Sequence, residues 1–226
     1  MSQDMLLTEV LARIETWYLA HVPAKVVALR SGITEHELTM LEETAGFRLP
    51  EAFNTLYRWH DGEEWNGSGV FRLDFMPLAE AATQLLSQRQ SVQTFGPEGD
   101  TVVSQPGQAI RGGFYNEAWF PLLHDGGGNF VGLDFAPGPA GMVGQIITFG
   151  RDEQHNYVLA DSLDAFLREY WARLDAGWVT VVNHDDEYWS VELHDSAGRH
   201  KSEYFVLAEL FPNFGVAPGI LEAPPS

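Results

Sequence analysis

The chain of 226 residues has a formal net charge of −19, and 45% of its residues are hydrophobic, including seven tryptophans and fourteen phenylalanines. This composition predicts a packed globule, and no apolar run is long enough to span a membrane. The lack of cysteine excludes disulfides, thiolate metal sites and cysteine nucleophiles.

The negative charge also bears on the partner. A field of this sign repels phosphate backbones and anionic lipid surfaces, which argues against nucleic-acid and membrane partners. It speeds encounter with a basic protein, although solubility alone is an alternative explanation of the charge. Residues 1–5 lack the features of a signal peptide, so we expect a cytoplasmic protein.

Apolar residues at helical spacing predict three helices near the start of the chain, over residues 5–20, 34–45 and 50–60. Thr34 and Glu37 form a capping-box pair at the start of the second helix, and Gly46 supplies a left-handed stop. Pro50 suits the first turn of the third helix. That helix should end at the Asp61-Gly62 turn.

The middle of the chain mixes strand, helix and loop signals. Alternation of Phe71, Leu73 and Phe75 with polar residues predicts a half-buried strand over 70–76, entered through an Asn66-Gly67 turn. A helix is expected over 78–89. Residues 91–113 show little periodicity and predict a long loop or irregular insertion.

Three short strands follow, separated by turns rich in glycine and proline, over residues 118–123, 130–135 and 145–149. This arrangement is typical of an antiparallel meander. Asp161, together with Asp164, is expected to cap a helix that runs to Leu174.

Beyond Gly177 the character changes, and we expect a domain over residues 1–177 with a C-terminal extension over 178–226 that packs on it. Strand or short-helix candidates in the extension cover 178–182, 188–193 and 204–210. The extension is either a hairpin that extends the sheet or a surface that faces a partner. Residues 212–226, rich in proline and glycine, predict a loosely held tail.

The run Asp125-Gly126-Gly127-Gly128-Asn129 invites comparison with phosphate-binding loops. Such loops open a helix and carry a lysine, whereas this run precedes a predicted strand and has no lysine nearby. We therefore expect a hairpin turn with positive φ angles.

Catalytic and metal signals are weak. The His-Asp dipeptide occurs four times, at positions 60, 124, 184 and 194, but each pair adjoins a predicted turn, where aspartate is common. Neither Ser68 nor Ser162 has the spacing of a nucleophile elbow. We expect no metal, no cofactor and no enzymatic activity.

Surface recognition is the remaining hypothesis. Two segments combine acidic residues with a large aromatic residue, a combination that suits binding to a basic protein. Alternatively, the tryptophans pack inward and the acids are only solvated. The predicted partner-binding residues are Asp61, Glu63, Glu64 and Trp65 in the first segment, and Asp185, Asp186, Glu187 and Trp189 in the second.

Several of these motifs occur together in one known family. They are Leu49–Phe53, Leu56-Tyr57, Asp61-Gly62, Trp119–Leu122, the glycine-rich run, Leu133-Asp134, Pro137, Gly144–Ile146 and Ala160–Leu163. In this order they resemble the SUKH (Smi/Knr-like) family, and the resemblance covers Ser31 to Leu174. It implies an α+β fold with a curved, mainly antiparallel sheet flanked by helices, here followed by a β-rich extension.

The resemblance also implies a binding module. Bacterial proteins of this kind are commonly immunity partners that neutralise toxins, often nucleases, by direct contact, and fungal relatives regulate cell-wall assembly. The acidic charge favours an immunity protein that covers a basic toxin domain. The alternative is a cytosolic regulatory scaffold of the Smi/Knr type, and behind it an enzyme of unrecognised type.

Overall fold

A computed structural model describes residues 5–22, 29–64, 69–96, 102–152, 154–184, 188–195, 198–199 and 204–211. Its helices are α1 Leu7–His21, α2 Glu35–Ala45, α3 Glu51–Trp59, α4 Leu78–Phe95, α5 Leu163–Asp175 and the 3₁₀ helix η2 Tyr204–Leu210. Its strands are β1 Leu29–Ser31, β2 His60–Glu63, β3 Asp74–Phe75, β4 Val103–Gln105, β5 Trp119–His124, β6 Asn129–Asp134, β7 Gln145–Gly150, β8 His155–Ala160, β9 Val179–His184 and β10 Tyr188–Leu193.

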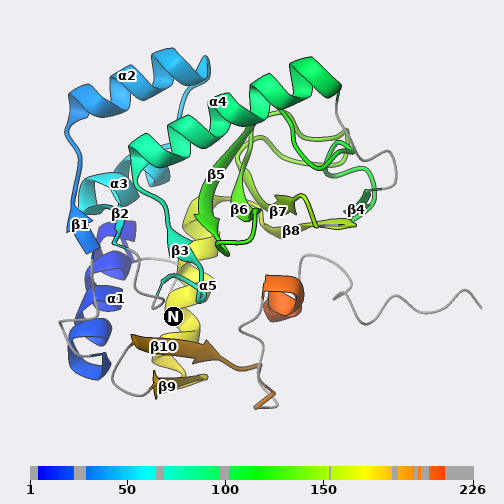
Figure 1. Cartoon of the computed structure of the whole chain (residues 1–226). Coiled ribbons are helices and arrows are strands. Elements are labelled where there is room, and N and C mark those ends of the chain that lie inside the picture. Colours follow the sequence, from blue (N-terminus) through cyan, green and yellow to red (C-terminus); the bar gives the residue numbers. More distant parts are fainter. Residues whose placement is uncertain are drawn as a thin grey trace, which may run out of the picture.

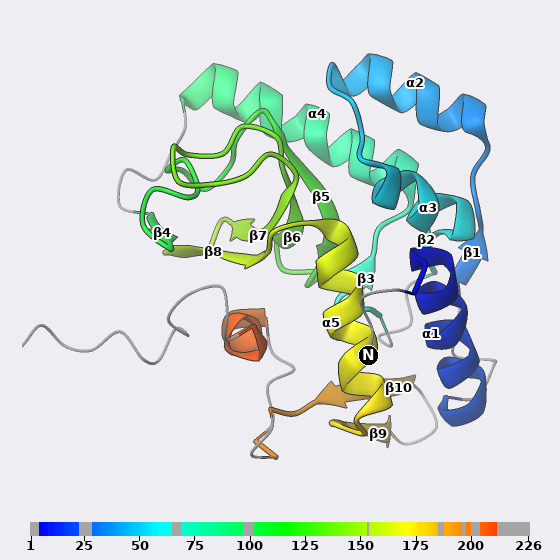
Figure 2. The ribbon, with the colours of Figure 1, turned by 180° about the vertical axis from the view of Figure 1, so that it is seen from behind.

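The main sheet has six strands in the order β3-β5-β6-β7-β8-β4. Its neighbours are antiparallel except β4, which pairs with β8 in parallel. Helix α4 lies against β5, and α5 lies against β7 and β8 (Figure 1). Seen from behind, α1 lies beside α5 (Figure 2). The expected α+β fold is confirmed, with an open sheet.

The core lies between the sheet and these helices and is rich in aromatic residues. Trp119, Phe120 and Phe149 are fully buried, and the ring of Phe53 from α3 meets Phe120 edge to face at 5.3 Å. Each such side chain contributes about 2–3 kcal/mol through burial. The third predicted helix thus lies against the sheet through the face that contains Phe53.

Local sequence signals at α2 are confirmed. Thr34 and Glu37 form a reciprocal capping box, and Gly46 ends the helix with a φ of 75°. Helices α1 and α3 also begin and end close to the predicted residues. The turn expected at Asp61-Gly62 is wrong, because both residues lie in strand β2.

The strand predicted over residues 70–76 is mostly wrong. Only Asp74 and Phe75 form a strand, because Phe71 and Arg72 have positive φ angles of 54° and 62° in a turn. Phe71, Leu73 and Phe75 are nevertheless buried. The burial pattern was therefore predicted correctly and the backbone conformation was not. The expected Asn66-Gly67 turn lies outside the described residues.

The long loop predicted over 91–113 is wrong in part. Helix α4 continues to Phe95, and Val103–Gln105 form an edge strand beside β8. The sequence pattern predicted neither this edge strand nor β8. Arg89 ties α4 to the end of α2, because its guanidinium donates hydrogen bonds to the carbonyl oxygens of Thr44 (3.2 Å) and Ala45.

The meander is confirmed as β5, β6 and β7. At the start of α5, however, the cap is Ser162 and not Asp161: the Ser162 hydroxyl accepts a hydrogen bond from the amide of Ala165 at 3.2 Å. Asp164 instead pairs with Arg168 at 2.7 Å.

The C-terminal extension forms a separate hairpin. Strands β9 and β10 make a two-stranded sheet of their own and do not extend the six-stranded sheet. Val191, Leu207 and Phe211 are buried, and the Phe211 ring contacts Phe71 and Phe166. The tail predicted over 212–226 lies outside the described residues. Within the part of the chain that the structure describes, no helix has the length and apolarity needed to cross a bilayer.

Gly132, in the middle of β6, provides a test of this packing. A Cβ atom added there would lie 2.1 Å from the carbonyl oxygen of Phe120. Gly132→Ala should therefore lower the free energy of unfolding by about 3 kcal/mol, at the upper end of overpacking costs. Urea denaturation followed by tryptophan fluorescence measures this. Gly107→Ala is the control, because a Cβ there meets no atom within 4 Å; equal effects of the two changes would contradict the packing.

Candidate protein-binding surface

The first predicted acidic segment is used mainly inside the fold. Asp61 Oδ1 accepts a hydrogen bond from the backbone amide of Leu78 at 2.7 Å, at the start of α4. Glu63 is only 9% exposed, and its Oε1 accepts a hydrogen bond from the amide of Phe75 at 2.9 Å. Glu64 is exposed, and Trp65 lies outside the described residues. Among the described carboxylates of this segment, Glu64 is therefore the exposed one.

Burial changes the acidity of Glu63. Loss of solvent raises its pKa to about 8, the Phe75 amide lowers it, and the negative charge of Asp74 raises it. Behind Glu63, the hydroxyls of Tyr18 and Tyr170 hydrogen-bond to each other. Glu63 is therefore largely protonated at neutral pH, and it adds little to the negative surface charge.

The second predicted segment is described only in part. Asp185, Asp186 and Glu187 lie outside the described residues, so their role stays a prediction. Trp189, on β10, is half-buried and packs against the core. Asp61 and Glu63 lie on β2 and Trp189 lies on β10, and these strands belong to different two-stranded sheets.

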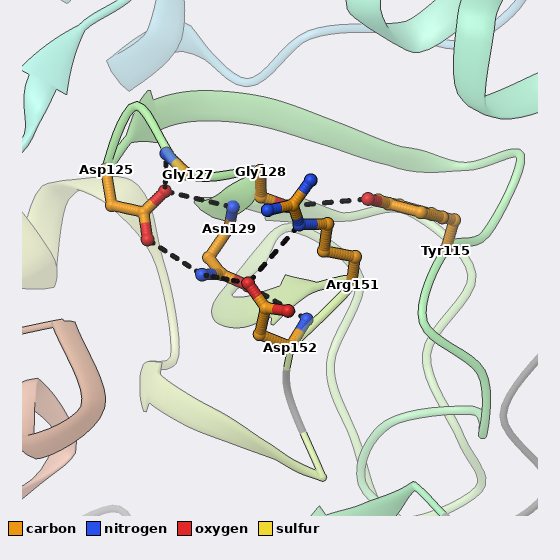
Figure 3. A network of polar contacts seen from close by, with 7 residues as sticks. All are labelled: Tyr115, Asp125, Gly127, Gly128, Asn129, Arg151 and Asp152. Atoms are coloured by element: carbon orange, nitrogen blue, oxygen red, sulfur yellow. Dashed lines mark hydrogen bonds and ion pairs between the residues drawn. The ribbon is translucent and has the colours of Figure 1, made fainter.

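The glycine-rich run forms the β5–β6 hairpin turn, as predicted, with φ angles of 74° at Gly126 and 103° at Gly128. Asp125 holds this turn through its carboxylate, which accepts hydrogen bonds from the amide of Gly127 (2.7 Å) and the side chain of Asn129 (2.7 Å). Asn129 Oδ1 accepts in turn from the amide of Asp152 at 3.2 Å, which links the hairpin to the β7–β8 turn. Figure 3 shows these side chains pointing toward one another.

The same end of the sheet carries Tyr115 and Arg151. The Tyr115 hydroxyl donates to the carbonyl of Gly128 at 3.4 Å, and Arg151 lies 3.3 Å from the carboxylate of Asp152 (Figure 3). The polar groups of this network are engaged with each other and with the backbone. The arrangement therefore accounts for a rigid hairpin turn.

The histidines of the His-Asp pairs that the structure describes have separate partners. His124 Nδ1 accepts from the amide of Gly126 at 3.0 Å, His60 Nδ1 donates to the carbonyl of Arg30 at 2.7 Å, and His194 Nε2 lies 2.9 Å from the hydroxyl of Thr180. Among the described residues, no group of three or more potential ligands could hold a metal ion.

Helix α2 offers a different kind of surface. It carries four glutamates and neither lysine nor arginine. On the side of α3 it borders a polar hollow of about 520 Å³ whose wall includes Glu35, Glu42 and Asn54.

On the side of α4 it borders a more apolar groove of about 410 Å³. We call this the α2/α4 groove. Its apolar lining consists of Ile33, Met40, Leu41, Leu78, Ala79 and Ala82, and Met40 is 50% exposed.

Sequence reasoning missed the α2/α4 groove. Leu38, Leu41 and Ala45 mark the buried face of α2 in the sequence, and Met40 lies off that face. Met40 alone gave no signal in the sequence, because single exposed apolar residues are normal and only a contiguous apolar patch marks a binding surface. The partner, α4, comes from a distant part of the chain, and its approach could not be derived from local patterns.

A third hollow, of about 510 Å³, lies between α1, α5 and β9. Trp17, Trp171 and Val181 are among its lining residues, together with Leu174 and Asp175.

The fold is thus an α+β domain with an open, mainly antiparallel sheet and hollows between its covering helices. Its sequence matches the model of the SMI1 / KNR4 family (SUKH-1) over residues 32–169, more than half of the chain. The chain belongs to this family, as the resemblance over Ser31–Leu174 predicted. The α2/α4 groove lies within the matched range, whereas the named lining residues of the third hollow lie outside it.

Several fungal proteins are similar to the chain. The cell wall assembly regulator SMI1 of Saccharomyces cerevisiae is 26% identical over 212 residues, covering 78% of this chain and 42% of the yeast protein. The glucan synthesis regulatory protein of Neurospora crassa is 29% identical over 201 residues, covering 73% and 38%. The cell wall biosynthesis/cell cycle regulator smi1 of Schizosaccharomyces pombe is 30% identical over 188 residues, covering 77% and 37%. The chain spans about two fifths of the length of these relatives.

The raised pKa of Glu63 makes stability depend on pH. The folded state holds a proton that the unfolded state, with an ordinary pKa of 4.5, releases. The free energy of unfolding should therefore fall as pH rises from about 4.5 to 8, by up to about 1.4 kcal/mol per unit. In the Glu63→Gln variant, most of this pH-dependent fall in the free energy of unfolding should disappear. Chemical denaturation at pH 5, 6, 7 and 8 checks it.

Glu64→Gln is the matched control, because Glu64 is the exposed neighbour. Asp134, whose pKa burial raises to about 6, should leave a residual slope below pH 6 in both variants. Identical slopes above pH 6 for the wild type and Glu63→Gln would show that Glu63 is ionised in the fold.

Asp125 gives a second test, which separates a structural from a chemical role for the turn. Asp125→Ala removes the acceptor of the Gly127 and Asn129 hydrogen bonds and should lower the free energy of unfolding by about 2 kcal/mol. Hydrogen exchange should accelerate at the amides of Gly127 and Asn129 while the helices stay protected. Unchanged exchange at both amides would contradict the assigned contacts. Glu64→Ala, another exposed carboxylate, should leave exchange as it is.

Proposed function

We propose that this protein is a non-enzymatic module that regulates a partner protein by binding it, in the cytoplasm. Its family membership and the names of its relatives, which are regulators of cell-wall assembly and glucan synthesis, support this proposal. These names favour the regulatory scaffold that the sequence analysis gave as the alternative. Because the chain spans only part of these relatives, their whole activity is not carried over to it.

The observation that carries the proposal is the surface around α2. A helix with four glutamates borders two hollows, and one of them has an apolar lining with Met40 at its edge. Protein-binding surfaces combine an apolar centre with a polar rim in this way. The polar network at the glycine-rich turn, by contrast, is occupied in holding the turn.

Toxin immunity is the second candidate function, and the observation in its favour is the net charge of −19. A charge of this sign would complement a basic toxin domain, with carboxylates in the positions of substrate phosphates. Here too the protein would act by direct contact. The two candidates differ in the identity of the partner and in how strongly binding depends on salt.

Site-specific photocrosslinking in the native cells tests both. With a photoreactive residue at Met40, we expect one partner to be captured in stoichiometric amount. A photoreactive residue at Leu19, which is 61% exposed on α1, is the control and should capture less of it. A captured component of a regulatory pathway supports the scaffold, whereas a basic protein whose toxic activity is silenced on binding supports immunity.

Salt dependence gives an independent criterion. A complex held mainly by charge should lose affinity steeply between low and physiological salt, and an apolar contact should lose little. Capture of no partner from either position would contradict a binding function for this surface. A hydrolytic activity of the purified chain that is lost in Asp125→Asn would favour an enzyme instead.

A further inference from the structure

We propose that the α2/α4 groove binds a basic amphipathic helix of the partner protein. This inference rests on the proposed binding function and specifies its site and the chemistry of its ligand. Helices α2 and α4 lie side by side along one face of the molecule in both views (Figures 1 and 2).

The apolar residues of α4 fit a helix. The exposed Ala79 and the half-buried Ala82 line the groove. Leu86, four residues further along α4 and 49% exposed, continues their spacing of three and four residues beyond the lining. They form a stripe of about two turns, roughly 10 Å long. Met40, on α2, supplies apolar surface on the opposite side of the groove. A partner helix with apolar residues at i, i+3 or i+4, and i+7 would match this length.

The backbone around the groove favours a helix over an extended segment. The groove runs between two helices, whose amide and carbonyl groups bond within each helix away from the ends. An extended partner would find few backbone groups to pair with and would leave its own unsatisfied. A helical partner satisfies its backbone hydrogen bonds within itself and needs no backbone partner in the groove.

The charges at the groove favour a basic partner. Its ionisable lining residues are His36, Glu37 and Asp61, and neither lysine nor arginine contributes to the lining. Hydrogen bonds from Thr34 lower the pKa of Glu37, so this carboxylate is held ionised. Lysine or arginine beside the apolar stripe of the partner would meet negative charge here, and the net charge of the chain would steer its approach.

The test uses three synthetic peptides of fourteen residues. The first has leucine at helical spacing and lysine elsewhere, the second replaces lysine with glutamate, and the third is a scramble of the first without an apolar face. Binding is measured by fluorescence anisotropy at physiological salt, and the site is mapped by amide chemical shifts. We expect only the first peptide to bind tightly, with shifts in α2 and α4.

Charge-matched variants separate the groove from the general acidity of the chain. Met40→Gln should weaken binding about tenfold, and Glu37→Gln about threefold, with a shallower salt dependence. Glutamine at position 37 preserves the capping box, so both variants should fold, as circular dichroism would check. The controls Leu19→Gln and Glu9→Gln change exposed residues of α1 in the same way and should alter affinity less than about twofold.

Three results would overturn the inference: equal binding of the scramble, equal losses in Glu37→Gln and Glu9→Gln, or shifts confined to other elements. The outcome is distinct from that of the crosslinking experiment. If Met40 captures a cellular partner and the basic peptide does not bind the groove, the binding function stands and the helical ligand is wrong. If the peptide binds the groove and no partner is captured, the ligand chemistry stands without the proposed function.

Discussion

The fold depends on covering two strands that are buried along their whole length. All residues of β6 and β7 are buried, including the polar residues Asn129, Asp134 and Gln145. A strand with no solvent-facing side needs layers on both faces and a partner for each polar group it contains. Helix α5 packs against β7, and α4 packs against β5 beside β6. The turns at the ends of the two strands supply partners for their polar groups.

The polar residues of the family motifs have this role. Asp134 and Gln145 face each other at one end of the strand pair, where the Gln145 amide donates to the Asp134 carboxylate at 2.9 Å and to the carbonyl of Ala109 at 3.0 Å. At the other end, Asp125 and Asn129 close the hairpin. These polar residues of the family motifs thus organise turns, and the helices on the outside are left to provide contact surface.

Some parts of the fold could be predicted because their causes are local. Thr34, Glu37 and Gly46 set the ends of α2 within a dozen residues, and the glycine-rich turn needs positive φ angles wherever it occurs. The alternation of apolar and polar residues over 71–75 also predicts which of these side chains are buried. The positive φ angles of Phe71 and Arg72 could not be predicted, because packing of the Phe71 ring against Phe166 and Tyr170 sets that conformation from a distance.

The same distinction applies to the candidate site. Glu63 has a sequence context typical of a solvated acidic loop, and it is buried because β3, α1 and α5 cover it. The α2/α4 groove exists only because residues about forty positions apart in the sequence meet. Short-range patterns identify which residues are acidic or apolar, but the approach of distant elements decides which of them remain on the surface.

The burial of Glu63 has a thermochemical consequence. Near pH 7 the folded chain carries a proton on this side chain, whereas the unfolded chain does not, so unfolding delivers about one proton to the solvent. The buffer takes up that proton with its own heat of ionisation. The calorimetric enthalpy of unfolding should therefore differ between buffers of equal pH, even though the protein passes between the same two states in each.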